Sequence, residues 1–405
     1  MLHRPVFYAL LCSWYCAASL NFPTSLNFPA NINHGLSLPT KRALIVAHGG
    51  ASGMLPEHTL PAFKLAVEQG ADILECGVSV THDLQLVCLH EPWLGDVTDV
   101  AAKFLERKQT HYFPDIRKMV TDYFSMDFTL EELQTLKVKQ RDSARDYSHD
   151  YMYGIATLDE VLQLMKNSQR PIGVYVETKH PEWVNELMAN RNQSTLEQLL
   201  VDKLKSFGCS SKSDPCLIES FSLESLERLK DLTSLPLVVL LDGLEVTNEE
   251  LDEWSQFCYA IAPWKGLIVE RTSDDKIDTV TELVNKAHTH GLKVHPYIFK
   301  NNDILPWDYG QDPYQEYEHF LRLGVDGFFT DYPLTLLRFL NVTYTSTTTT
   351  SNKACEKQQN THSAETSSSH SIAYSLGLAS GNSSSSVFTV LALFIALSMA
   401  STYLR

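Results

Sequence analysis

Two groups that could take part in catalysis lie close together in the segment ADILECGVSVTHDLQLVCLH, positions 71–90. Two apolar runs flank a turn there, and Glu75 and His90 are the residues that could do chemistry. Gly77 lies two positions after Glu75, so the two residues face the same side of a strand. A metal site would want a second carboxylate at that position. The glycine therefore raises the question of whether this strand has lost one of two metal-binding carboxylates.

Eight short apolar runs could form the strands that position these residues. Several are nearly continuous in Val, Ile and Leu, which is typical of strands buried on both faces. The runs cover 43–48, 71–76, 172–177, 216–221, 235–241, 259–263, 292–299 and 325–330. Helical patterns intervene at 60–70, 195–208, 223–232, 279–291 and 313–324. Eight strands that alternate with helices predict an α/β fold, a (β/α)8 TIM-type barrel. The segment at about 92–169 is too long for a loop and predicts a helical insertion after the strand-2 hairpin, beside the mouth of the barrel.

In such barrels, active sites collect at the carboxyl ends of the strands. Polar residues stand at six of the predicted strand ends, and several carboxylates and histidines would converge there. They are His48, Glu75, Glu177 with Lys179, Glu219, His295 and Asp331. We interpret Asp331 as a carboxylate that fixes a loop. We expect His58 to have a structural role in the first strand-to-helix loop.

Both ends of the 405-residue chain resemble processing signals. Residues 1–18 form a basic and then apolar segment typical of a secretory signal peptide, with an N-terminal membrane anchor as the alternative. A Pro-containing linker covers 19–40, the barrel 41–340 and a Ser/Thr-rich stalk 341–382. The apolar end, 383–405, follows small residues and resembles a GPI-attachment signal, with a retained transmembrane tail as the alternative. The sequence thus predicts passage through the secretory pathway and a lipid anchor on the extracellular face of the plasma membrane.

Charge and cysteine content are consistent with that location. The net charge of −16 has no basic stripe to offset it, which argues against a nucleic-acid partner. Six cysteines remain once the two in the signal peptide are removed, an even number that permits disulfides in an oxidising compartment. Cys209 and Cys216 bracket a polar loop, and Cys76 and Cys88 flank a hairpin turn, so both are candidate pairs. Three N-glycosylation sequons begin at Asn192, Asn341 and Asn382.

Four motifs carry a resemblance to a known family. They are AHGGASGMLPEHTLPAF after the first strand, ADILECGVSVTHDLQLVCLHE, VYVETKHP and GVDGFFTDYP. In these motifs the chain resembles the glycerophosphodiester phosphodiesterases, most closely the periplasmic bacterial type. The resemblance covers nearly all of 41–340, and the motifs occur in order at the expected strand ends.

The resemblance implies hydrolysis of a small-molecule glycerophosphodiester to an alcohol and glycerol 3-phosphate, with Ca²⁺ or Mg²⁺ as the cofactor. By motif, His48 and His90 correspond to the catalytic histidines, Glu75 and Glu177 to metal ligands, and Lys179 to a phosphate-binding lysine. The chemistry is independent of the name. Imidazole can move protons near neutral pH, hard carboxylate oxygens suit these cations, and a cation with a lysine can neutralise the phosphoryl oxygens. His295 and Glu219 are further candidates for substrate contact, and Glu219 could also compensate for a missing carboxylate.

Three positions depart from the family pattern. Gly49 stands in place of an arginine, Gly77 in place of a metal-binding aspartate, and Glu91 in place of an aspartate. Two hypotheses follow. One is an active phosphodiesterase anchored at the cell surface, or a variant that accepts lysophospholipids. The other is a pseudoenzyme that binds a phosphodiester, lipid headgroup or protein partner without turnover. If the site geometry is intact, Gly77→Asp and Gly49→Arg should raise the rate.

Overall fold

A row of eight parallel strands closes on itself to form the centre of the protein. The computed structural model describes residues 42–243, 245–302 and 305–343. The strand order is β12-β9-β8-β7-β6-β2-β1-β13. The strands are β1 (Leu44–Ala47), β2 (Ile73–Val80), β6 (Gly173–Thr178), β7 (Cys216–Ser220), β8 (Leu237–Leu241), β9 (Cys258–Pro263), β12 (Lys293–Val294) and β13 (Gly327–Thr330). The segment after β12 meets β13, where the Phe299 N–H donates to the Phe329 carbonyl at 2.8 Å. The predicted eight-stranded barrel is confirmed, with a strand at each of the eight predicted runs.

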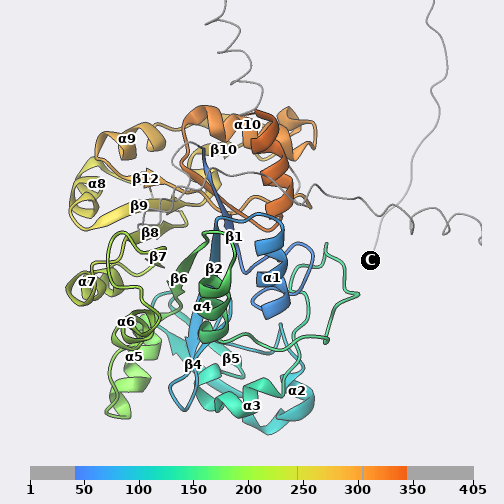
Figure 1. Ribbon diagram of the computed structural model, residues 1–405, viewed down its shortest axis with the longest axis vertical. Helices are drawn as coiled ribbons and strands as arrows, with labels where there is room; N and C mark the ends of the chain where they lie inside the picture. Colours follow the sequence, from blue (N-terminus) through green and yellow to red (C-terminus); the bar gives the residue numbers. More distant parts are fainter. Residues whose placement is uncertain (1–41, 244, 303–304, 344–405) are drawn as a thin grey trace, which may run out of the picture. The chain divides into compact units, whose positions relative to one another are not determined.

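Helices surround the strands, as Figure 1 shows. They are α1 (Leu60–Glu68), α4 (Leu158–Asn167), α5 (Pro181–Asn190), α6 (Leu196–Ser206), α7 (Leu223–Leu232), α8 (Asn248–Ser255), α9 (Leu283–Thr289) and α10 (Pro313–Leu323). Alternation along each strand separates the two cores. In β1, Val46 packs inside the barrel, whereas Ile45 packs between the strands and the helices. The strands are therefore buried on both faces, which explains their continuous apolar sequences.

The insertion forms a separate layer at one end of the barrel. The short strand β3 (Leu86–Cys88) runs antiparallel to β2 and leads into it. The insertion contains α2 (Val100–Lys103), the antiparallel pair β4 (Gln109–Phe113) and β5 (Lys118–Asp122), and α3 (Leu130–Gln134). Its small core includes Leu94, Phe128 and Leu133. Helix α4 falls within the range expected for the insertion, but it contacts α1, β2, β3 and β6 and thus serves as a barrel helix.

A second antiparallel pair, β10 (Val269–Arg271) and β11 (Ile277–Val280), precedes α9.

Disulfides join Cys76 to Cys88 and Cys209 to Cys216, which confirms both pairs expected from the sequence. Within the described residues, no helix is both long and apolar enough to cross a bilayer. The expected signal peptide, linker and apolar C-terminal segment, together with nearly all of the expected stalk, lie outside the described residues.

Candidate active site

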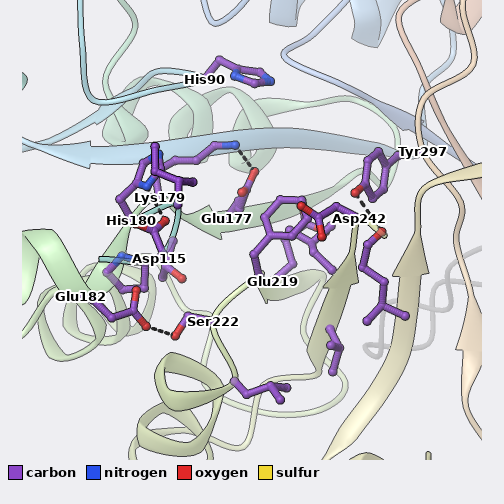
Figure 2. Close-up of a pocket in the computed structure, with 18 of the residues that line it drawn as sticks. His90, Asp115, Glu177, Lys179, His180, Glu182, Glu219, Ser222, Asp242 and Tyr297 are labelled. Carbon is purple, nitrogen blue, oxygen red and sulfur yellow. Dashed lines mark hydrogen bonds and ion pairs between the residues drawn. The ribbon is translucent and has the colours of Figure 1, made fainter. Parts of the chain in front are cut away.

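A cavity of about 780 Å³ lies at the carboxyl ends of the barrel strands. This volume is in the range of small-molecule sites. Residues far apart in the chain line it, among them His48, Glu75, His90, Glu177 and Glu219. Figure 2 shows several of these side chains around the cavity, with Lys179 reaching back toward Glu177. The barrel therefore brings together the two histidines and two carboxylates that the sequence suggested as a site.

The two histidines approach each other closely. The ring centroids of His48 and His90 lie 5.7 Å apart, and the ring planes are nearly perpendicular, at 89°. His48 follows β1, and its backbone N–H donates to the Thr330 carbonyl at 3.1 Å. His90 follows β3, which is tied to β2 by strand pairing. A substrate group between the rings could thus contact both imidazoles.

A buried carboxylate orients His48. Nδ1 of His48 donates to Oδ1 of Asp331 at 2.8 Å, and the other oxygen of Asp331 accepts a hydrogen bond from Arg145. Asp331 is fully buried, and the side chain of Arg145 is only 3% exposed. Burial lowers the pKa of His48, but the hydrogen bond to Asp331 and nearby carboxylate charge outweigh burial and raise it above 6.5. His48 therefore holds a proton more readily than a free imidazole does.

The environment of His90 has the opposite effect. Burial and the positive charge of Lys179 lower the pKa of His90, although Glu91 works against them. Nδ1 of His90 lies 3.3 Å from Oε1 of Glu91. His90 therefore favours the neutral form. Two titratable groups with pKa values pushed apart are suited to opposite roles in proton transfer.

Three glutamates gather in the same cavity as the histidines. Glu75, Glu177 and Glu219 each offer an oxygen atom, and these atoms lie within 4.8 Å of one another. All three residues are buried. Burial raises the pKa of Glu219 well above its usual range, and the charges of Glu75 and Glu177 raise it further. A hard divalent cation would relieve this repulsion, and three carboxylate oxygens are a donor set that Ca²⁺ and Mg²⁺ accept.

One hydrogen bond and one lysine hold two of these glutamates. Oε2 of Glu75 accepts the Gly49 N–H at 2.7 Å. Nζ of Lys179 lies 2.5 Å from Oε2 of Glu177. Burial lowers the pKa of Lys179, but the charges of Glu177, Glu91 and Glu75 outweigh it, so the lysine stays charged. It supplies a fixed positive charge beside the carboxylates.

The two glycines at the site do not leave open space. Gly49 has φ +59°, a conformation that strains an L side chain, and a Cβ there would lie 3.1 Å from Glu57 Cβ. A Cβ at Gly77 would lie 2.6 Å from both the Leu89 carbonyl oxygen and Cε of Lys179. Asp at position 77 would therefore require the Leu89 carbonyl and Lys179 to shift, and Arg at position 49 would be strained by the positive φ. The gain in rate expected from these two substitutions, which assumed an intact geometry, stays a prediction.

His180 joins the insertion to the barrel. Its Nε2 bonds Oε2 of Glu91 at 2.7 Å, and its Nδ1 bonds Asp115 in the turn between β4 and β5. Burial lowers the pKa of His180, but hydrogen bonds to Asp115 and Glu91 outweigh it and raise the pKa to about 9. A cation thus fixes the turn of the insertion at the rim of the cavity.

Two other histidines lie away from the cavity surface. His295 is fully buried, and its Nδ1 bonds the Tyr175 hydroxyl at 2.7 Å inside the barrel. It is not among the described residues that line the cavity, so the structure does not place it for substrate contact. His58 is buried, and its backbone N–H donates to the Gly49 carbonyl at 2.9 Å, which fits the structural role expected for it.

Sequence reasoning missed two residues of this site and part of the role of a third. Asp331 does hold a loop, because it accepts a hydrogen bond from Arg145, but it also contacts His48 directly, which the sequence interpretation did not include. Its place immediately after the last strand was the available signal. Arg145 and His180 were not identified, because each acts through a partner that is distant in sequence.

Comparison with known proteins agrees with this geometry. Residues 48–335 match the glycerophosphoryl diester phosphodiesterase family. A glycerophosphodiester phosphodiesterase of Arabidopsis thaliana is 35% identical over 319 residues, covering 73% of this chain and 85% of the relative. One from Haemophilus influenzae is 29% identical, covering 73% and 89%.

A solved structure of an Oleispira antarctica phosphodiesterase, in complex with the product sn-glycerol-3-phosphate, shares the fold. Its TM-score is 0.52 at 18% identity, covering 74% of this chain and 96% of that one. The family match extends from His48 to beyond Asp331 and thus includes each strand end that contributes to the cavity. The chain belongs to the glycerophosphoryl diester phosphodiesterase family.

Proposed function

We propose that this protein hydrolyses glycerophosphodiesters to an alcohol and glycerol 3-phosphate. The observation that carries the proposal is the pair of imidazoles, 5.7 Å apart, together with three buried glutamates in one cavity. The relatives named as glycerophosphodiester phosphodiesterases support the reaction. The product sn-glycerol-3-phosphate bound in the Oleispira structure supports the substrate class.

His90 and His48 divide the proton transfers. His90, which favours the neutral form, accepts a proton from the nucleophile, which is water or the neighbouring hydroxyl of the glycerol moiety. Attack by that hydroxyl gives a cyclic phosphate, which water then opens to glycerol 3-phosphate. His48, whose pKa is raised and whose ring is held by Asp331, donates a proton to the leaving alcohol oxygen. Lys179 provides positive charge for the phosphoryl oxygens. Roles divided in this way suit a reaction in which one oxygen gains a proton while another loses one.

Glu75, Glu177 and Glu219 would hold a divalent cation, with Ca²⁺ and Mg²⁺ the candidates that fit their oxygen donors. When bound, such a cation supplies Lewis-acid stabilisation of the charge on the phosphoryl oxygens. The donor set fits because all three side chains are buried and their oxygens converge. Metal dependence is therefore part of the proposal.

The location is also part of it. We place the protein on the extracellular face of the plasma membrane, attached by a C-terminal lipid anchor. The signal-like start, the GPI-like end and the sequons support this location. Two disulfides support an oxidising compartment. Treatment of intact cells with a phosphatidylinositol-specific phospholipase C tests the anchor, because cleavage of a GPI anchor should release the protein into the medium.

Steady-state assays test the activity. Purified protein is incubated with glycerophosphocholine, and separately with lysophosphatidylcholine, in Ca²⁺, Mg²⁺ or EDTA. We expect turnover with metal, none in EDTA, and loss in His48→Ala. The absence of turnover with every metal would favour the alternative, a barrel that binds a phosphodiester without cleaving it. Gly49 and Gly77 are the residues that favour that alternative.

A change of leaving group tests the division of roles. A p-nitrophenyl phosphodiester leaves without protonation, so a general acid contributes little to its cleavage. His48→Ala should therefore retain much more of its activity on this substrate than on glycerophosphocholine, whereas His90→Ala should lose activity on both. The reverse pattern would exchange the two roles.

A further inference from the structure

Strand register places Glu219 and Gly77 on opposite sides of Glu177. In the barrel, Gly77 of β2 pairs with Glu177 of β6, and Glu177 pairs with Glu219 of β7. The three residues therefore lie on one level of the sheet. Glu75 lies one step lower on the same face of β2, where it pairs with Tyr175. A carboxylate absent from one neighbour of Glu177 is thus present on the other.

The β2 side of this level is closed. A Cβ at Gly77 would come within 2.6 Å of the Leu89 carbonyl oxygen and of Cε of Lys179, and within 3.4 Å of its Cγ. The aliphatic part of Lys179 therefore fills the space that a side chain at position 77 would need. Glu177 holds the lysine there through Nζ, at 2.5 Å. Together these contacts leave the β2 position without room for a ligand.

The β7 side has a carboxylate oriented into the cluster. Glu219 is 1% exposed, and its Oε2 is buried without a hydrogen-bond partner among the residues that the structure describes. An ionised carboxylate is costly to bury without a partner. A ligand atom of Glu219 also lies within 4.8 Å of those of Glu75 and Glu177. A buried carboxylate with an unpartnered oxygen, next to two other carboxylates, is what a cation ligand would leave when no cation is bound.

We infer that Glu219 is a metal ligand that replaces the carboxylate missing at Gly77, so that the ligand set of the site is Glu75, Glu177 and Glu219. The ligand position has moved from β2 across Glu177 to β7. The inference rests on the proposed function only in that it assumes a divalent cation at this site. It explains how the cavity keeps three carboxylates although the sequence lacks the one expected on β2.

Direct metal binding tests this assignment without substrate. Mn²⁺ is titrated into metal-free protein, and the free ion is followed by its electron paramagnetic resonance signal. Glu219→Gln should raise the Kd for Mn²⁺ by about tenfold or more, because affinity at such sites depends on ligand charge. Glu182→Gln is the matched control, since Glu182 lines the same cavity outside the cluster. Its affinity for Mn²⁺ should equal that of the parent.

Thermal unfolding checks that the variant is folded. Gln removes a buried carboxylate, so metal-free Glu219→Gln should unfold at a temperature no lower than the parent. Mn²⁺ should raise the Tm of the parent and raise that of Glu219→Gln much less. Gly77→Asp should not tighten Mn²⁺ binding and should lower Tm, because its side chain displaces Lys179 or the Leu89 carbonyl.

Three results would overturn the assignment. They are an unchanged Kd in Glu219→Gln, no Mn²⁺ binding by the parent, and tighter binding in Gly77→Asp. The activity assays distinguish failure of the proposed hydrolase function from failure of the ligand assignment. Mn²⁺ binding that requires Glu219, together with no cleavage of any phosphodiester, would reject the hydrolase and leave the metal site standing. Cleavage with Mn²⁺ affinity independent of Glu219 would reject the ligand assignment alone.

Discussion

The contact between His48 and Asp331 provides the sharpest test of the proposed chemistry. Asp331→Asn keeps the shape of the side chain but removes its charge. Asp331 is fully buried and bonds Nδ1 of His48 at 2.8 Å. It is not among the described residues that line the cavity. The substitution should therefore change the histidine without changing the surface that meets the substrate.

The expected loss follows from the type of bond. A hydrogen bond to a charged group contributes about 1.5–3 kcal/mol. Each 1.4 kcal/mol lost from the transition state is about tenfold in rate, so kcat should fall roughly 10- to 150-fold. Asn can also donate to Nδ1 and stabilise the wrong tautomer, which would add to the loss. KM should stay nearly constant, because the residue does not contact the cavity.

The pH dependence gives a second readout. The groups that raise the pKa of His48 are Asp331, Glu75 and Glu57. Removing the charge of Asp331 therefore lowers the pKa of His48. Because the protonated form of His48 is the proposed active one, the alkaline limb of kcat should move to lower pH in Asp331→Asn. An unshifted limb would indicate that another group donates the proton.

A matched control separates chemistry from folding. Asp326, at the other end of β13, bonds Nε2 of His288 at 2.8 Å and also pairs with Lys293. Asp326→Asn therefore breaks a similar histidine–aspartate contact outside the cavity and should leave kcat unchanged. Folded Asp331→Asn with kcat within twofold of the parent would refute the reasoning.

Three further predictions concern the charged groups around the cavity. Lys179→Met should lower kcat/KM on glycerophosphocholine by about 10²–10³-fold, the loss typical of one donor to a developing anion, and an unaltered value would exclude a phosphate-binding role. Arg145→Met leaves a buried carboxylate short of a partner and should lower the free energy of unfolding in urea by about 3 kcal/mol; a change below 1 kcal/mol would contradict a buried pair. The pKa of His180 is raised to about 9, so its stabilising contribution, at most about 3 kcal/mol, is complete below pH 6.5 and is lost as the pH rises through 9. Unfolding of His180→Gln, followed over that pH range, should show a flatter dependence than the parent.

The barrel could be predicted because its signal is local. Each strand is a continuous apolar run, as in β6 and β8, and turns or helical patterns separate the runs. The strand order then follows from the fold, and the position of Glu75 and Glu177 near strand ends follows from their place in the chain. These two residues and both histidines were therefore accessible from sequence.

Other parts of the site depend on contacts that the sequence does not show. Asp331 meets His48 across 283 positions, and Arg145 reaches Asp331 from a loop without periodic pattern. The position of Glu219 beside Glu177 depends on the register between β6 and β7. His295 shows the reverse error. It follows a strand, as the histidine of a site would, but its ring turns into the barrel toward Tyr175.

The disulfide between Cys76 and Cys88 links the geometry of the active site to the redox state of the compartment in which the chain folds. Cys76 lies directly between Glu75 and Gly77, and Cys88 lies two residues before His90. One covalent bond therefore sets the spacing between a carboxylate and an imidazole of the same cavity. A copy made in a reducing cytosol would lack that bond and would hold these two groups by strand pairing alone. Formation of this bond would therefore couple the spacing of Glu75 and His90 to the oxidising compartment proposed above.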